Sequence, residues 1–175
     1  LAEPEPGGTR WSLPDAVIYP TGGGTGVLGM WKAWGELEAL GLIDSRRPRM
    51  LCVQSEVTSP LVRAFDAGDD DTTVVAAGNT ISFGLNVPGG VGHFKVLQII
   101  RESGGAAVAV SEADTAAELQ RTWRDKRWWI SPEGAACLAA IPQLLDRGML
   151  RRGERVVAVN TGSVEKYLSA LRHLL

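Results

Sequence analysis

The chain has 175 residues, of which 45% are hydrophobic and 22% charged, and its formal net charge is -2. A chain of this size buries roughly two thirds of its unfolded surface, so it can form one globular unit. The weak charge excludes the strong positive field of a nucleic-acid-binding protein, and no apolar run approaches the roughly 20 residues that span a bilayer. We therefore expect a cytoplasmic protein that binds neither nucleic acid nor a membrane.

The first elements are a linker, a strand and a helix. Residues 1–14 are rich in proline and glycine and predict a linker, and we expect the folded unit to span residues 15–175. The short apolar run at residues 16–19 predicts a buried strand. Apolar residues at helical spacing predict a helix over residues 27–40 that ends at Gly41.

The next stretch predicts a strand, a short helix and a surface excursion. Residues 50–54 (MLCVQ) are apolar up to Gln54 and predict the second strand. Ser59 followed by Pro60 is typical of a helix start, so we expect a helix over residues 61–67. Residues 66–86 mix the acidic run GDDDTT with glycines and hydroxyl residues, which predicts an excursion over the surface.

The second half repeats the alternation of helix and strand. Apolar spacing predicts a helix over residues 93–103, and residues 106–110 predict the third strand. Ser111 begins a variant of the capping box, which predicts a helix to about residue 124. Residues 128–130 predict a fourth strand.

The last elements complete an α/β pattern. Ser131 and Pro132 predict a helix that continues to residues 145–148, residues 156–160 predict a fifth strand, and Gly162 leads into a closing helix. Alternating strands and helices predict a three-layer α/β fold, with a mainly parallel sheet and helices on both faces. Ligands of such folds bind at the carboxyl ends of the strands.

A glycine-rich turn joins the first strand to the first helix. Residues Gly22, Gly23, Gly24, Thr25 and Gly26 place several backbone N–H groups at the positive end of a helix dipole, which favours an anion. Glycine allows the positive φ of such a turn and the close approach of a phosphate. A purely structural role, in which the glycines only let helix and strand pack, is the alternative.

The same glycines also fit a dinucleotide site. Residues 24–29 satisfy the pattern G-x-G-x-x-G, and Glu56 follows the next strand, where a Rossmann fold binds a ribose hydroxyl. Glu56 comes 32 residues after Gly24, later than the usual distance of about 20. A NAD-binding oxidoreductase is therefore an alternative from another class of protein.

The wider sequence resembles one enzyme family. The turn and the following LGMWKAWGELEALGLI resemble the phosphate loop and helix of threonine synthases, which are tryptophan-synthase-like (fold type II) pyridoxal-phosphate enzymes. Four further segments resemble family segments in the family's order: PRMLCVQSEVTSPLVRAF, NTISFGLNVPGGVGHFKVLQIIRESGG, SPEGAACLAAI and RVVAVNTGSVEKY. The resemblance covers most of residues 15–170 and implies the large domain of such an enzyme.

The resemblance implies a cofactor, a substrate and site residues. It implies that the turn at residues 22–26 cradles the phosphate of pyridoxal 5′-phosphate, that Thr161 meets the pyridine nitrogen and that Glu133 lies near the ring. A neutral hydroxyl cannot hold a proton on that nitrogen, which makes the ring a moderated electron sink. A helix N-cap for Thr161 and a helix-dipole partner for Glu133 are the alternatives.

The family reaction converts O-phospho-L-homoserine and water to L-threonine and phosphate, so the implied partner is a small amino-acid substrate. Some relatives hold a cation at the position of Glu56, but Pro60 and Val62 nearby supply no second carboxylate. We therefore predict no metal. A threonine or serine dehydratase relative would share these features, and so would a noncatalytic, anion-binding remnant.

One family feature is missing from the sequence. Family members form a Schiff base with the cofactor through a lysine in a Ser-Phe-Lys-Asp-Arg-like segment, which this sequence lacks. Its lysines, Lys32, Lys95, Lys126 and Lys166, are predicted to be surface residues. We therefore expect the carboxyl-terminal part of the enzyme, inactive alone, with the missing amino-terminal part as its partner; a homodimer is compatible with this.

The histidines and cysteines carry no motif of their own. His93 and His173 are widely separated and predict ordinary surface or half-buried side chains rather than an acid–base pair. Cys52 and Cys137 lie in apolar stretches and predict buried thiols, with no spacing typical of a metal site or a disulfide.

Overall fold

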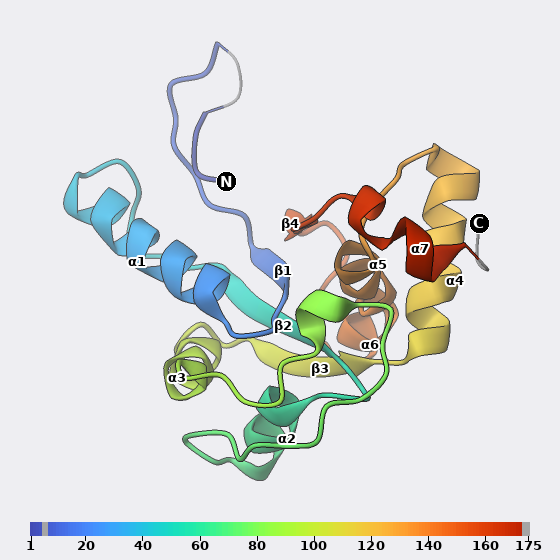
Figure 1. Cartoon of the computed structure of the whole chain (residues 1–175). Coiled ribbons are helices and arrows are strands. Elements are labelled where there is room, and N and C mark those ends of the chain that lie inside the picture. Colours follow the sequence, from blue (N-terminus) through green and yellow to red (C-terminus); the bar gives the residue numbers. More distant parts are fainter. Residues whose placement is uncertain (5–6, 173–175) are drawn as a thin grey trace.

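A computed structural model describes residues 1–4 and 7–172 and contains a four-stranded, fully parallel sheet (Figure 1). The strands lie in the order β3-β2-β1-β4, and their bounds are β1 (Ala16–Pro20), β2 (Arg49–Ser55), β3 (Ala106–Val110) and β4 (Val156–Ala158). The strand β1 is central, because Ile18 is level with Leu51 on one side and with Ala158 on the other. The predicted α/β class is confirmed.

The helices cover both faces of this sheet. Their bounds are α1 (Thr25–Ala39), α2 (Pro60–Ala67), the 3-10 turn η1 (Phe83–Leu85), α3 (His93–Glu102), α4 (Glu112–Lys126), α5 (Pro132–Ala139), α6 (Ile141–Asp146), the 3-10 turn η2 (Val164–Tyr167) and α7 (Leu168–Leu171). Among the described residues, no helix is long and apolar enough to cross a bilayer.

Successive strand residues supply two separate cores, because side chains alternate across a strand. Ile18 and Leu51 pack with α5 and α6 on one face. Val17 and Met50 pack with α1, α2 and α3 on the other. Every strand is therefore apolar at consecutive positions, which is the pattern that the sequence shows, although the residues of the edge strand β4 are only half-buried.

The predicted strand at residues 128–130 is wrong. The side chain of Trp129 stacks on Trp123 of α4 with ring centroids 4.1 Å apart, and Arg127 ends α4 in the left-handed region at φ 57°. Trp129 thus packs on the helix and Trp128 is exposed, so neither enters the sheet, and Ile130 forms only an isolated antiparallel bridge to Ser163.

Two other predicted elements differ from the structure. The helix expected from Ser131 to residues 145–148 is divided into α5 and α6 at Ala140, next to Pro142, whose ring provides no N–H for a continuous helix. The predicted strand 156–160 ends at Ala158, because the Asn160 side chain turns to accept hydrogen bonds from the N–H and hydroxyl of Ser131, both at 3.0 Å.

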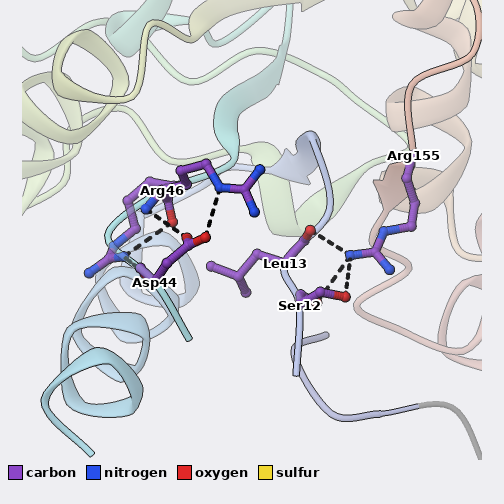
Figure 2. Close-up of polar contacts among 6 residues, drawn as sticks. Ser12, Leu13, Asp44, Arg46 and Arg155 are labelled. Atoms are coloured by element: carbon purple, nitrogen blue, oxygen red, sulfur yellow. Dashed lines mark hydrogen bonds and ion pairs between the residues drawn. The ribbon is translucent and has the colours of Figure 1, made fainter. Parts of the chain in front are cut away.

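The stretch before β1 is tied to the chain before β4. The Arg155 guanidinium donates to the carbonyl oxygens of Ser12 and Leu13 and to the Ser12 hydroxyl, while Asp44 pairs with Arg46 nearby (Figure 2). The main-chain N–H of Arg155 also donates to the Asp15 carboxylate at 2.7 Å. These contacts lie at the amino ends of the strands, opposite the glycine turn.

Both cysteines are free and fully buried, as predicted. Burial raises the pKa of the Cys52 thiol to about 12 and raises that of Cys137 as well. A thiol with a raised pKa carries little thiolate at neutral pH, so both residues act as small apolar side chains.

Candidate functional site

The glycine turn lies at the carboxyl end of the central strand β1, where α1 begins. The Thr21 N–H donates to the Val53 carbonyl at 2.8 Å, which holds the start of the turn against β2. Helix α1 begins after Gly24 with no side-chain cap and no acidic residue in its first turn. Within the described ranges, no side chain accepts from the amides of residues 22–26.

Three of these glycines are required by their surroundings. A Cβ on Gly22 would lie 2.3 Å from the Gly84 carbonyl oxygen, and one on Gly24 would lie 2.4 Å from Cγ2 of Val96. Gly24 also has a φ of 85°, in the region that favours glycine. A Cβ on Gly26 would lie 1.9 Å from the Tyr19 hydroxyl. Packing alone therefore explains these three positions.

Gly23 differs from its neighbours in the turn. A Cβ at this position would meet nothing within 4 Å, and its φ lies outside the left-handed region. The chain itself therefore gives no steric reason for glycine here. Open space beside uncapped amides at a helix start suits a group that approaches the main chain from outside, and the residues present fit an anion.

Gln54 braces the turn from β2. Its fully buried side chain donates to the Thr21 carbonyl at 3.1 Å and accepts from the N–H groups of Leu61 and Val62 at 2.9 and 3.3 Å. The expected cap of α2, Ser59, makes no side-chain hydrogen bond to the helix. One glutamine from a strand thus caps α2 and holds the turn, which the sequence pattern did not indicate.

His93 is buried against the turn, so the prediction of an ordinary surface or half-buried side chain is wrong for it. Its exposed fraction is 0%, and its Nε2 lies 2.8 Å from the Gly22 carbonyl oxygen. A polar residue at the first position of a helix carries no sequence signal for burial, because the partner is 71 residues away. His173 lies outside the described residues.

Thr161 follows β4 at the same edge of the sheet as the turn. The Val159 N–H donates to the Ile18 carbonyl at 3.0 Å, so the chain leaves β4 alongside the end of β1. Thr161 is exposed, and the N-cap hydroxyl of the next turn is that of Ser163, which accepts from the Glu165 N–H. The helix-cap interpretation of Thr161 is therefore wrong.

Glu133 is buried next to the segment that contacts the turn. Its Oε1 accepts from the Gly84 N–H and from the Tyr167 hydroxyl, both at 2.8 Å, and its exposed fraction is 3%. Its Oε2 is buried and has no hydrogen-bond partner among the described residues, and the same holds for the Ser82 hydroxyl. Burial and the Glu133 carboxylate raise the pKa of Tyr167.

These contacts form one connected unit around the turn. The Gly84 carbonyl lies against Gly22, and the Gly84 N–H is held by Glu133. On its other side Gly22 is held by His93. The structure thus connects Glu133 and the turn, two sites that the sequence placed 107 residues apart, counting from Gly26 to Glu133.

The dinucleotide alternative loses its physical basis in the structure. A Cβ on Gly29, the third glycine of the pattern, would meet nothing within 4 Å, so helix α1 does not need glycine there to pack on the sheet. Glu56, the candidate for the ribose hydroxyl, is exposed. As a separate point, no cluster of metal-ligating side chains occurs in residues 1–4 and 7–172.

The lysines are exposed at the surface of the chain. Lys32 pairs with Glu36 on the outside of α1, and Lys95 donates to Gln98 on the outside of α3. Lys126 and Lys166 are exposed as well. The prediction that all of them are surface residues is confirmed.

Comparison with known proteins agrees with this geometry. A profile of the family described as "Pyridoxal-phosphate dependent enzyme" matches residues 8–162. Threonine synthases of Methanocaldococcus jannaschii and Methanosarcina acetivorans are 31% and 30% identical over 87% and 89% of this chain. The chain spans 38% of the length of each of these relatives.

Solved structures show the same fold. An L-serine ammonia-lyase from Rhizomucor miehei superposes with a TM-score of 0.74 at 21% identity, over 93% of this chain and 50% of that one. The threonine synthase from Escherichia coli superposes with a TM-score of 0.66 at 18% identity, over 95% of this chain and 36% of that one.

Proposed function

The chain belongs to the pyridoxal-phosphate-dependent enzyme family, and from this premise we propose that it is the carboxyl-terminal portion of a threonine synthase. The proposed reaction converts O-phospho-L-homoserine and water to L-threonine and phosphate. It is supported by the identity to curated threonine synthases and by the glycine turn. A cytoplasmic location and a small amino-acid substrate are parts of the same proposal.

The observation that carries the proposal is the free side of the turn. The amides of residues 22–26 have no side-chain acceptor among the described residues, α1 begins without an acidic residue, and the space beside Gly23 is open. Together, aligned amides and a helix dipole bind a phosphate group without lysine or arginine. We assign Gly22, Gly23, Gly24, Thr25 and Gly26 to the cofactor phosphate.

Two further residues of this chain would hold the rest of the cofactor. Thr161 would hydrogen-bond the pyridine nitrogen through its exposed hydroxyl, at the same sheet edge as the turn. Glu133 would lie near the ring, with its buried Oε2 still without a partner in the described chain. Pyridoxal phosphate, when bound, supplies an electron sink for negative charge on substrate carbons.

The cofactor-anchoring lysine is proposed to come from another part of the enzyme. The lysines of this chain are exposed and lie on outer helix surfaces or in surface turns. Without that lysine the chain has no covalent anchor and no base for proton transfer at the substrate, so we expect it to be inactive alone. The proposed partner is therefore the preceding part of the enzyme. The assembled enzyme would be a monomer or a homodimer.

The assay for this function measures two products. The chain, supplied with a polypeptide that carries the lysine segment, is expected to release inorganic phosphate from O-phospho-L-homoserine and to form threonine in equal amounts. The chain alone is expected to form neither. Release of ammonia and a 2-oxo acid from serine or threonine would instead identify a dehydratase, and phosphate binding without turnover would identify a noncatalytic remnant.

Thr161 is tested by comparing two ligands. Thr161→Val removes the hydroxyl from an exposed site, so we expect an unchanged unfolding midpoint in urea. Affinity for pyridoxal 5′-phosphate should fall about fivefold to tenfold, because one hydrogen bond is lost, while affinity for inorganic phosphate stays the same. Titration calorimetry with both ligands measures this. An equal loss for both ligands, or none, would contradict the contact to the ring.

A further inference from the structure

His93 lies on the buried side of the glycine turn, opposite the side that is open to a ligand. It is the first residue of α3, and its ring is fully buried. A buried imidazole needs partners for both nitrogens, and this one has them. Its Nε2 lies 2.8 Å from the Gly22 carbonyl oxygen, and its Nδ1 lies 3.1 Å from the Gly90 nitrogen and 3.0 Å from the Thr72 hydroxyl.

The partners determine where the ring carries its proton. The Gly90 N–H can only donate, so Nδ1 must accept and cannot itself carry a proton. The Gly22 carbonyl can only accept, so Nε2 must donate. The hydrogen bonds therefore require the neutral ring with its proton on Nε2. An imidazolium would direct a second N–H against that of Gly90.

The bond to Gly22 also determines the direction of the next amide. No peptide bond in the described residues is cis, and in a trans peptide the C=O and the following N–H point in opposite directions. Since the Gly22 carbonyl points to the buried His93, the Gly23 N–H points to the other side of the peptide. A Cβ on Gly23 would also meet nothing within 4 Å, so the chain leaves open space at this residue.

We propose that His93, as the neutral ring protonated on Nε2, is a positioning residue that turns the Gly23 amide toward the ligand phosphate. This proposal rests on the proposed function, because the phosphate in question is that of the cofactor. His93 touches no ligand and acts only through Gly22. Through Nδ1 it also joins the turn to Thr72 in the surface excursion, so that one side chain orders the turn and the excursion together.

Two substitutions separate the donor from the acceptor of the ring. In His93→Gln the amide nitrogen can reach the position of Nε2 and still donate to Gly22. In His93→Asn the shorter side chain reaches only the position of Nδ1. Phe94→Asn, at an exposed neighbouring position of the same helix, is the matched control for asparagine in α3.

The probes are inorganic phosphate and pyridoxal 5′-phosphate, titrated into the full chain by calorimetry. We expect His93→Asn to weaken the binding of both by about tenfold or more, and His93→Gln and Phe94→Asn to stay within about threefold of the unaltered chain. Equal binding by His93→Asn and the unaltered chain would overturn the proposal. Equal weakening in His93→Asn and His93→Gln would also overturn it, because the donor would then not be the cause.

A second measurement does not depend on any variant folding. Long-range proton–nitrogen NMR spectra of the unaltered chain at neutral pH should show the His93 ring with Nε2 protonated and Nδ1 bare. A proton on Nδ1 would overturn the proposal. If the unaltered chain binds neither probe, the proposed function fails, and this spectrum still decides whether His93 donates to the turn through Nε2.

Discussion

Gly22→Ala is expected to lower the free energy of unfolding by about 2–3 kcal/mol and to abolish phosphate binding. The new Cβ would lie 2.3 Å from the Gly84 carbonyl oxygen, and 3.0 Å from a Val87 methyl group. To relieve this clash, the backbone must move either at Gly22, which is held by His93, or at Gly84, which is held by Glu133. Urea denaturation measures the loss of stability, and calorimetry with inorganic phosphate measures the loss of binding.

Gly23→Ala is the matched control in the same turn. Its Cβ meets no atom within 4 Å and its φ is compatible with alanine, so stability should change by less than about 0.5 kcal/mol. Phosphate binding should still fall, because the methyl group occupies the open side of the turn. A Gly23→Ala variant that binds phosphate as well as the unaltered chain would show that the ligand does not approach there.

Glu133→Ala is expected to lower the free energy of unfolding by about 3 kcal/mol. The substitution leaves the Gly84 N–H and the Tyr167 hydroxyl without their acceptor and opens a cavity beside η1. Because Gly84 lies directly against Gly22, the glycine turn should loosen as well. Denaturation in urea measures stability, and hydrogen exchange of the turn amides measures the loosening.

Glu133→Gln separates the hydrogen bonds from the charge. The carbonyl oxygen of glutamine can still accept from Gly84 and Tyr167, so stability should remain within about 1 kcal/mol of the unaltered chain. The pKa of Tyr167, which burial and the Glu133 carboxylate raise, should move down once the carboxylate is gone. Ultraviolet titration of the phenol measures this. Glu165→Ala, at an exposed position, is the control and should change neither quantity.

The sequence pattern predicted the alternation of strands and helices because each element carries a local signal. Apolar runs predicted β1, β2 and β3, and the pattern at Ser111 predicted the start of α4, where the Ser111 hydroxyl accepts from the Asp114 N–H at 3.0 Å. The prediction of a strand at residues 128–130 was wrong because aromatic residues are equally common in a strand and in a loop that packs on a helix. The break at Ala140 was missed although Pro142 was visible in the sequence.

The residues of the candidate site also fall into those that the sequence indicated and those that only the structure shows. The glycine turn could be found from the sequence, because glycines between a strand and a helix have a local meaning. Thr161 and Glu133 were inferred from resemblance to a family, and the structure adds that Glu133 is buried and that its Oε2 has no hydrogen-bond partner in the part of the chain that is described. Gln54 and His93 were missed as supports of the turn, since each acts on residues 33 or 71 positions away.

By itself, the sequence determined the α/β class, the order of the main elements and the place of the glycine turn, because periodicity, capping and glycine conformation act over a few neighbouring residues. Only the tertiary structure decided which side of the turn is open and which is held. That depends on Gly84, Glu133 and His93 meeting Gly22 across long separations, and such meetings follow from how the chain packs around β1.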